Sequence, residues 1–158
     1  TAKTLAYAWG KPIVGAPTLE ALAYGCPCAD GWVAALLDAQ KGRVYRAIYR
    51  WQAGRLCEVS PVEIAPATAV VAELAALPAP VMVVGESVRE HRALIDATNG
   101  RVVAAPEAAL MPRAAVVALL GYEKWQQGTA VRPEELNPFY VRRAEAEELW
   151  ERRLREKA

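Results

Sequence analysis

The sequence is poor in the residues that build metal sites and disulfide frameworks. Its 158 residues contain one histidine and three cysteines. An odd number of cysteines is typical of a reduced, cytoplasmic protein rather than a disulfide-stabilised one. A metal site needs several ligands at compatible spacing, whereas Cys26 and Cys28 stand far in sequence from Cys57 and from His91. We therefore expect a cytoplasmic protein without a bound metal.

Long hydrophobic runs and an excess of one charge are also lacking. No apolar run approaches the roughly 18 residues of a membrane-spanning helix. The 19 basic and 18 acidic residues give a net charge of +1, so no global field attracts nucleic acid or an anionic membrane. Four arginines, at positions 43, 46, 50 and 55, still gather on one stretch. A local basic patch, and with it a direct RNA-binding role, remains an alternative.

The motifs of nucleotide and acyl-transfer chemistry are missing as well. The chain has no glycine-lysine phosphate loop, no G-x-G-x-x-G and no G-x-S-x-G. A catalytic triad is not indicated either, because His91 would have to serve as its only histidine. The sequence therefore names no catalytic residue and no cofactor.

The residues that are present make a core-forming chain organised around one hairpin, residues 32–49. Its first arm is nearly all apolar, which is typical of a strand buried on both faces. Its second arm alternates, and Gly42 supplies the positive φ that the turn needs. Residues 55–59 return as a third strand. A base-stacking surface on Tyr45, Tyr49 and Trp51 is the alternative to packing within the sheet, and packing is expected.

Helices and strands alternate in the rest of the chain. The pattern predicts helices over 68–77, 86–95 and 112–128, strands over 80–85 and 101–103, and a connector bracketed by Pro61 and Pro66. Before the hairpin it predicts a helix over 1–9, a strand over 11–15 and a helix over 17–24. A crossing segment marked by Pro133 and Pro138 leads to a charged helix over 144–157, with Glu148–Arg152 and Glu151–Arg155 pairs. The hairpin and the elements after it give a mixed five-stranded α/β sheet with the order βββαβαβα.

Two places in this pattern are weak candidates for a nucleotide site. Asp38 ends a buried strand before the turn, where a carboxylate could hold a metal–phosphate complex, but an Asx-type hydrogen bond within the turn explains it better. Gly85 and Ser87 lie between a strand and a helix, where a helix N-terminus could bind an anion. A role of Ser87 as N-cap is the favoured alternative, because Glu86 would repel a phosphate.

Three segments carry a resemblance to a known family. They read A-K-T-L-A through K-P-I-V-G to L-E-A-L-A over 2–23, L-L-D-A-Q-K-G-R-V-Y over 36–45, and P-F-Y-V-R-R-A-E-A-E over 138–147. Together they resemble the bacterial TsaB (YeaZ) family, the glycoprotease-like branch of the actin-like ATPase superfamily. The order βββαβαβα is that of the ribonuclease H-like lobe, which this superfamily uses twice. Two departures are mild: Pro17-Thr18 replaces a Ser-Ser pair, and Gln40-Lys41 replaces an Arg-Arg pair.

The resemblance implies a division of the chain into three parts. The family's opening strands and its G-P-G-S-F-T-G-L-R stretch have no counterpart, so the chain resembles the C-terminal two-thirds of such a protein. Residues 1–30 would be the end of a first, incomplete ribonuclease H-like lobe, and residues 31–130 a complete second lobe. Residues 131–158 would be the crossing segment and charged helix.

The resemblance also implies a function in tRNA modification. The family supplies a non-catalytic scaffold subunit that binds the TsaD transferase, with a TsaE-like ATPase as a further partner and a homodimer on the same helices. TsaD carries an H-x-x-x-H metal motif, which a chain with only His91 cannot reproduce. The expected partner interface is Lys3, Thr4 and Tyr7, on what remains of a docking helix. The alternative is an enzyme of the actin-like fold, a glycoprotease or phosphotransferase with a degenerate nucleotide site.

Overall fold

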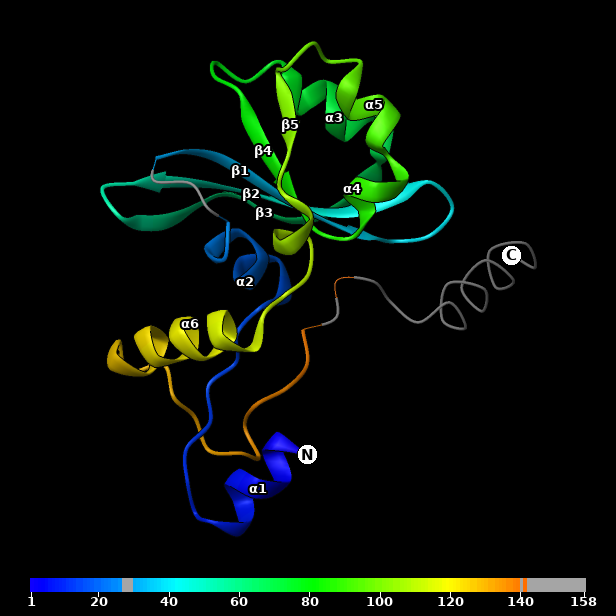
Figure 1. The fold of residues 1–158 in the computed structure, drawn as a ribbon. Coiled ribbons are helices and arrows are strands. Elements are labelled where there is room, and N and C mark those ends of the chain that lie inside the picture. The colour runs from blue at the N-terminus through cyan, green and yellow to red at the C-terminus, as the bar shows by residue number, and fades with distance from the viewer. Residues whose placement is uncertain (27–29, 140, 142–158) are drawn as a thin grey trace, which may run out of the picture.

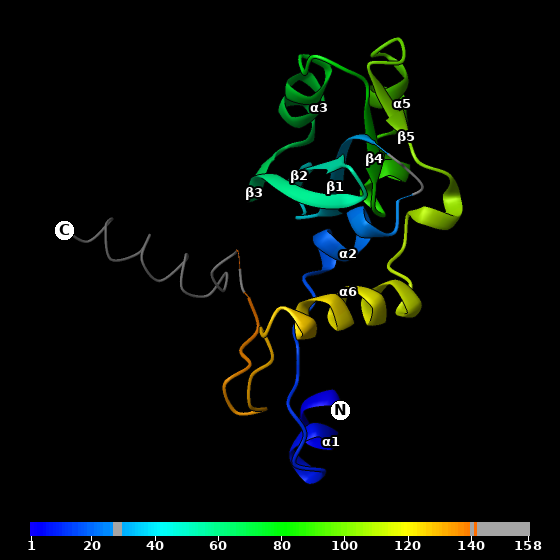
Figure 2. The ribbon, with the colours of Figure 1, turned by 90° about the vertical axis from the view of Figure 1, so that its left-hand side faces the viewer.

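The fold is a mixed five-stranded sheet with helices on both faces, as the sequence predicts (Figures 1 and 2). A computed structural model describes residues 1–26, 30–139 and 141. Strand order is β3-β2-β1-β4-β5. The strands are β1 (Gly31–Asp38), β2 (Arg43–Gln52), β3 (Arg55–Pro66), β4 (Val81–Val84) and β5 (Val102–Ala104). The first three pair antiparallel as a meander, and β1–β4 and β4–β5 pair parallel.

The helices divide between the two faces of this sheet. They are α1 (Ala2–Ala8), α2 (Thr18–Tyr24), α3 (Ala67–Ala75), α4 (Ser87–Glu90), α5 (Arg92–Asp96) and α6 (Ala114–Gln126), with a 3-10 turn η1 (Glu107–Ala109). Figure 2 shows α3 and α5 on one side of the sheet and α2 and α6 on the other. Helix α1 lies beyond α6, at the far end of the molecule (Figure 1).

Strand β1 is the centre of the core. It pairs with β2 on one edge and β4 on the other, and its residues Val33 to Leu36 are all buried. Both faces of the strand are therefore covered, which confirms the expectation drawn from its unbroken apolar run. No described helix is long and apolar enough to cross a membrane.

The third strand is longer than the sequence indicates. A connector was expected between Pro61 and Pro66, but β3 continues to Pro66. Two features explain why proline is tolerated. β3 is an edge strand, and its register slips between the Arg46–Glu63 and Ile48–Ser60 pairs, so that Pro61 sits in a bulge.

Three other expectations change in detail. The helix over 86–95 is two short helices, because the backbone at His91 (φ −103°, ψ 18°) leaves the helical region. The strand over 11–15 is only an isolated bridge between Ile13 and Val131. The charged helix over 144–157 lies outside the described residues.

Candidate functional site

The predicted partner interface lies on α1, which is mostly exposed. Of its seven residues only Ala6 is buried. Tyr7 is 68% exposed and Thr4 is exposed, whereas Lys3 reaches the crossing segment, where its Nζ donates to the Leu136 carbonyl oxygen at 2.8 Å. Thr4 and Tyr7 are therefore exposed to solvent, whereas Lys3 holds α1 to the crossing segment.

Sequence reasoning missed two further side chains at this end of the molecule. Leu5 and Trp9 are exposed, Trp9 by 67% of its surface. They are four residues apart and so lie on one side of the helix, with Tyr7 on another side. The i,i+4 spacing of Leu5 and Trp9 was the available signal. We call Leu5, Tyr7 and Trp9, which are exposed on two sides of the helix, the α1 patch.

Beside α1 lies an apolar groove of about 660 Å³. Four segments line it: α1, the start of α2, the face of β1–β3 near the turn, and the crossing segment. Its apolar side chains include Leu19, Leu37, Val62, Leu136 and Phe139. A mostly apolar lining with a few polar groups is typical of grooves that bind ligands or partner segments.

Asp38 and Gly85 lie at the same end of the sheet, where the parallel strands β1 and β4 both end. The Asp38 Oδ1 accepts a hydrogen bond from the Gln40 backbone N–H at 2.7 Å, which is the Asx-type contact that holds the turn. Gly85 has a φ of +107°, and a Cβ built on it would lie 2.0 Å from the Leu36 carbonyl oxygen. Close packing of the two backbones therefore accounts for the glycine.

Ser87 lies at the same end of the sheet but is not an N-cap. Glu86 is the N-cap residue of α4, with helical φ and ψ, and Ser87 is the first helical residue. The Ser87 side chain is buried, and its Oγ has no hydrogen-bond partner among the described residues. The prediction that Ser87 is the N-cap of this helix is therefore wrong.

Two of the four arginines that could form a basic patch on the meander make contacts within the fold. Arg46 is buried, and its Nη2 lies 2.9 Å from Glu63 Oε2 and 3.3 Å from Glu73 Oε1. Arg50 lies over the Trp32 ring, 5.2 Å from its centroid. The charge of Arg46 is therefore neutralised within the fold, whereas Arg50 keeps its charge and lies against an aromatic ring.

The aromatic residues of the hairpin are packed rather than displayed. Tyr49 is buried, and burial together with the nearby Glu58 and Glu20 carboxylates raises the pKa of its hydroxyl. The Trp51 ring contacts that of Tyr24 at 5.6 Å between centroids, and its Nε1 donates to the Ala23 carbonyl oxygen at 3.3 Å. These contacts favour packing over base stacking, as expected.

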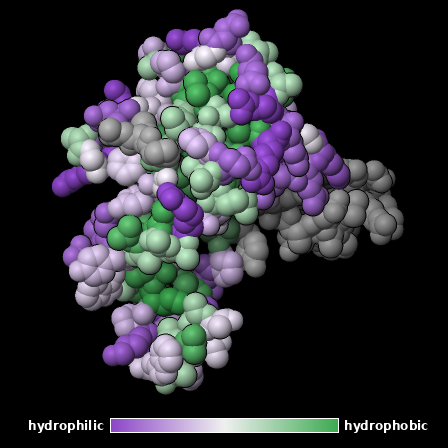
Figure 3. Space-filling model, in the orientation of Figure 1, coloured by the Kyte–Doolittle hydropathy of each residue, from purple (hydrophilic) through white to green (hydrophobic). Residues whose placement is uncertain are grey.

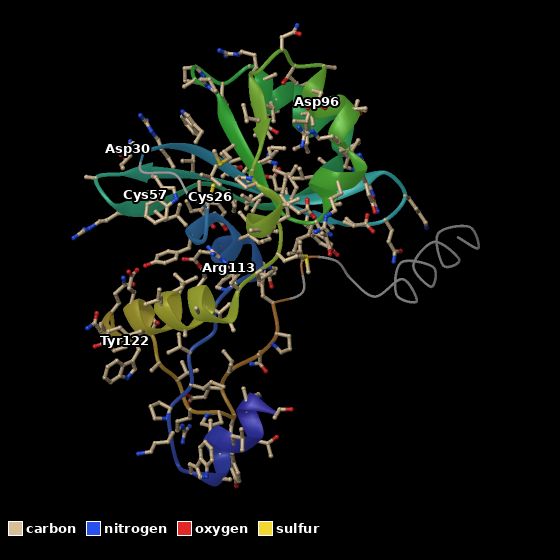
Figure 4. All side chains as sticks on the ribbon, viewed as in Figure 1. Cys26, Asp30, Cys57, Asp96, Arg113 and Tyr122 are labelled. Atoms are coloured by element: carbon tan, nitrogen blue, oxygen red, sulfur yellow. The ribbon has the colours of Figure 1, made fainter. Side chains whose placement is uncertain are left out.

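Helix α6 is fixed to α2 through its charged residues. The Tyr24 hydroxyl donates to Glu123 Oε1, and Lys124 Nζ lies 3.0 Å from Glu20 Oε2. The hydrogen bond, with some burial and the carboxylate charge, raises the pKa of Tyr24 to about 12. Figure 4 shows Arg113 at the start of α6, where its Nη2 donates to the Gly25 carbonyl oxygen at 3.0 Å.

Within residues 1–26, 30–139 and 141, no group of three or more histidine, cysteine, aspartate or glutamate side chains is arranged to hold a metal ion. Cys26 is buried and its Sγ lies 3.1 Å from Met82 Sδ, while Cys57 is exposed. Cys28 is outside the described residues.

Comparison with known proteins gives consistent matches. The family model TsaD: tRNA N6-adenosine threonylcarbamoyltransferase matches residues 1–150. The Bacillus subtilis (strain 168) tRNA threonylcarbamoyladenosine biosynthesis protein TsaB is 33% identical over 152 residues, which cover 94% of this chain and 64% of that protein. The resemblance to TsaB (YeaZ) drawn from three sequence segments is thereby confirmed.

Solved structures agree with these sequence matches. YeaZ from Pseudomonas aeruginosa has a TM-score of 0.65 and 25% identity, over 87% of this chain and 64% of its own. A second structure, of an uncharacterized protein with similarity to peptidase YEAZ from Pseudomonas aeruginosa, has a TM-score of 0.71 and 26% identity, over 89% and 63%. The chain thus spans slightly under two thirds of the length of each of these relatives.

Proposed function

The chain belongs to the TsaD family, tRNA N6-adenosine threonylcarbamoyltransferase, and from this premise we propose that it is a non-catalytic scaffold subunit that binds a TsaD-like transferase. In that role it supports threonylcarbamoyladenosine modification of tRNA in the cytoplasm and meets tRNA only through the transferase. The name of the Bacillus subtilis relative supports the link to threonylcarbamoyladenosine.

The observation that carries the proposal is the α1 patch. Leu5 and Tyr7 of α1 and its C-cap residue Trp9 are exposed, whereas Ala6 is the one buried residue of the helix. Large apolar side chains exposed together at one end of a molecule are typical of a protein–protein contact surface. Lys3, Thr4 and Tyr7 are the interface residues that we propose, and Leu5 and Trp9 extend that surface.

Further partners and the division of the chain are also part of this proposal. A TsaE-like ATPase and a second copy of the subunit are the other proposed partners. We propose that residues 1–30 belong to a first ribonuclease H-like lobe, residues 31–130 form the second, and residues 131–158 cross between them. The contact between Lys3 and the Leu136 carbonyl supports a crossing segment that ties the two ends together.

Native mass spectrometry of the chain mixed with a purified TsaD protein tests the proposal. A one-to-one complex is expected, and Tyr7→Ser together with Trp9→Ser should weaken it at least tenfold, because the interface loses two aromatic anchors. Val59→Ser removes an exposed apolar side chain from the distant strand β3 and is the matched control. Equal binding by the α1 double variant and the control would place TsaD elsewhere and contradict the proposal.

The enzyme alternative has little to support it. Asp38 and Gly85 each have a backbone contact that accounts for the residue without a nucleotide. A titration with ATP and magnesium, compared between the wild type and Asp38→Ala, addresses it directly. Saturable binding that disappears in Asp38→Ala would favour the enzyme over the scaffold.

A further inference from the structure

The turn between α5 and β5 presents an Asn-Gly pair to solvent. Asn99 and Gly100 are both exposed, and both have a left-handed backbone, with φ of +51° and +82°. Asparagine and glycine are the residues that tolerate this conformation best. The turn lies at the top of Figure 1, at the end of the molecule opposite α1. Hydrophilic residues gather on the surface at this end (Figure 3), and Asp96, labelled in Figure 4, precedes the turn on α5.

No hydrogen bond restrains the two groups of this pair that can react with each other. The turn is closed by the Arg101 backbone N–H, which donates to the Thr98 carbonyl oxygen at 3.1 Å. Within the described part of the chain, neither the Asn99 carboxamide nor the Gly100 backbone N–H has a hydrogen-bond partner. Both groups are therefore accessible to each other and to water.

An asparagine followed by glycine can lose ammonia from its side chain. Glycine has no Cβ, so its backbone nitrogen can come close to the carboxamide carbon Cγ of the preceding residue. In this chain the Gly100 nitrogen would attack Asn99 Cγ and form a new C–N bond. The carboxamide nitrogen leaves as ammonia and takes the proton of the Gly100 N–H, which gives a cyclic succinimide. One water molecule then opens the ring at either carbonyl, so that the product is aspartate or isoaspartate.

The second asparagine of the chain lacks these features. Asn137 precedes Pro138, whose nitrogen carries no hydrogen and cannot form the succinimide. The Asn137 Nδ2 also donates to the Glu135 carbonyl oxygen at 3.2 Å, so its carboxamide is held. Asn137 is therefore an internal control for Asn99.

We propose that Asn99 is a modification site, at which the folded chain deamidates without an enzyme to an aspartyl and an isoaspartyl form. Water is the only co-reactant. The inference goes beyond the proposed function and does not depend on it, because the turn and α1 lie at opposite ends of the molecule (Figure 1).

The contacts around the turn indicate what the isoaspartyl form would disturb. The Thr98 Oγ1 donates to the Ile95 carbonyl oxygen at 2.7 Å and accepts from the Val102 N–H at 2.9 Å, which joins the end of α5 to the start of β5. The Arg101 Nε donates at 3.0 Å to the carbonyl oxygen of Ala75, the last residue of α3. In isoaspartate the backbone runs through Cγ and gains one carbon. The longer segment no longer fits these contacts.

Mass spectrometry of the tryptic peptide 93–101 measures the reaction. The folded chain is incubated in mildly alkaline buffer, sampled over time and digested. The peptide should gain the mass difference between a hydroxyl and an amino group and separate into two isomers on chromatography. Free peptide 93–101 is the unfolded reference. The folded chain should react within about tenfold of its rate, because an exposed turn opens at little cost. The peptide that contains Asn137 should keep its mass.

Gly100→Ala tests the identity of the attacking atom. Its Cβ would meet no atom within 4 Å, so the turn can hold it, but the methyl group hinders the approach of the nitrogen to Asn99. Deamidation at Asn99 should slow about tenfold. Gly128→Ala is the matched control, because its φ of +77° is similar and its Cβ also meets no atom within 4 Å. This control should deamidate at Asn99 like the wild type.

Asn99→Asp separates the new charge from the longer backbone. This variant should unfold in urea like the wild type, because aspartate also tolerates the left-handed conformation. The isoaspartyl fraction of an aged sample, quantified in the peptide, should have an unfolding equilibrium constant about tenfold larger, because hydrogen bonds of Thr98 and Arg101 are lost.

Three outcomes would overturn the proposal or its consequence. If the free peptide deamidates but the folded chain does not, the turn protects Asn99. Equal rates in the wild type and Gly100→Ala would exclude the Gly100 nitrogen as the attacking atom. An aged, isoaspartate-rich sample as stable as Asn99→Asp would contradict the expected effect on α3, α5 and β5.

Discussion

Replacing Gly85 by alanine should cost far more stability than any other glycine-to-alanine change in the turns of the sheet. The added Cβ would lie 2.0 Å from the Leu36 carbonyl oxygen and 2.9 Å from its carbon. These are backbone atoms of the central strand, so they cannot rotate away as a side chain would. The φ of +107° is itself unfavourable for alanine.

The magnitude is the sum of these two contributions. A backbone angle of this kind costs about 1–3 kcal/mol, and forcing extra volume into a packed core costs about 1–3 kcal/mol more. Together they give about 4 kcal/mol, a large share of the roughly 5–15 kcal/mol by which a domain is stable. Gly54→Ala is the control: its φ of +74° is comparable in sign, but its Cβ would meet nothing within 4 Å.

Equilibrium urea unfolding, followed by circular dichroism, gives the free energy of unfolding of both variants. Gly54→Ala should lose about 1 kcal/mol, from the left-handed backbone alone. Gly85→Ala should lose about 4 kcal/mol, or fail to fold in buffer where Gly54→Ala folds. A difference between the two variants of less than about 0.5 kcal/mol, within which unrelated sites normally add, would refute the clash with Leu36 as the reason for the glycine.

Three further predictions concern the polar contacts. Glu63→Gln or Glu73→Gln alone should lower the free energy of unfolding by less than about 1 kcal/mol, whereas the double variant should lower it by about 3 kcal/mol, because the buried Arg46 then has no carboxylate partner. If the losses of the two single variants in urea unfolding simply add up to that of the double variant, the two carboxylates do not substitute for each other. Ser87→Ala should leave the free energy of unfolding unchanged or raise it, because the variant removes a buried hydroxyl without a hydrogen-bond partner among the described residues. A decrease of more than about 1 kcal/mol in that free energy would reveal a hydrogen bond to Ser87. The pKa of Tyr24 is raised from 10.0 to about 12 in the folded chain. The hydrogen bond of its hydroxyl therefore stabilises the fold fully below pH 10, and this stabilisation is lost as the pH rises towards 12. The stability difference between the wild type and Tyr24→Phe should therefore shrink over that range in urea titrations, and a constant difference would mean that the hydroxyl proton is not what Glu123 binds.

The sheet was predictable because its signals are local. The apolar run of β1, the alternation of β2 and the turn at Gly42 each depend on residues close in sequence. They gave the meander, and the alternating helices and strands gave the parallel half. The end of β3 was not predictable in this way, because a proline ends most strands. Pro61 is tolerated here because β3 is an edge strand and has a bulge at this position.

Surface contacts were predicted less well, since they depend on which elements meet. The sequence places Arg46 among other arginines, but only the pairing of β2 with β3 and the packing of α3 bring Glu63 and Glu73 to it. Likewise α6 is apolar on nearly every side, so periodicity alone could not tell which residues face α2. The outward direction of Tyr122 and Trp125 became visible only with the helix docked.

The bulge in β3 also limits how the chain can meet other proteins. A straight edge strand offers free N–H and C=O groups, to which a strand of another chain can add. Pro61 lacks an N–H and sits where the register slips, so the β3 edge is interrupted in its middle. The opposite edge, β5, is only three residues long. Neither edge of this sheet is therefore a good template for strand addition, which protects the protein from edge-to-edge aggregation.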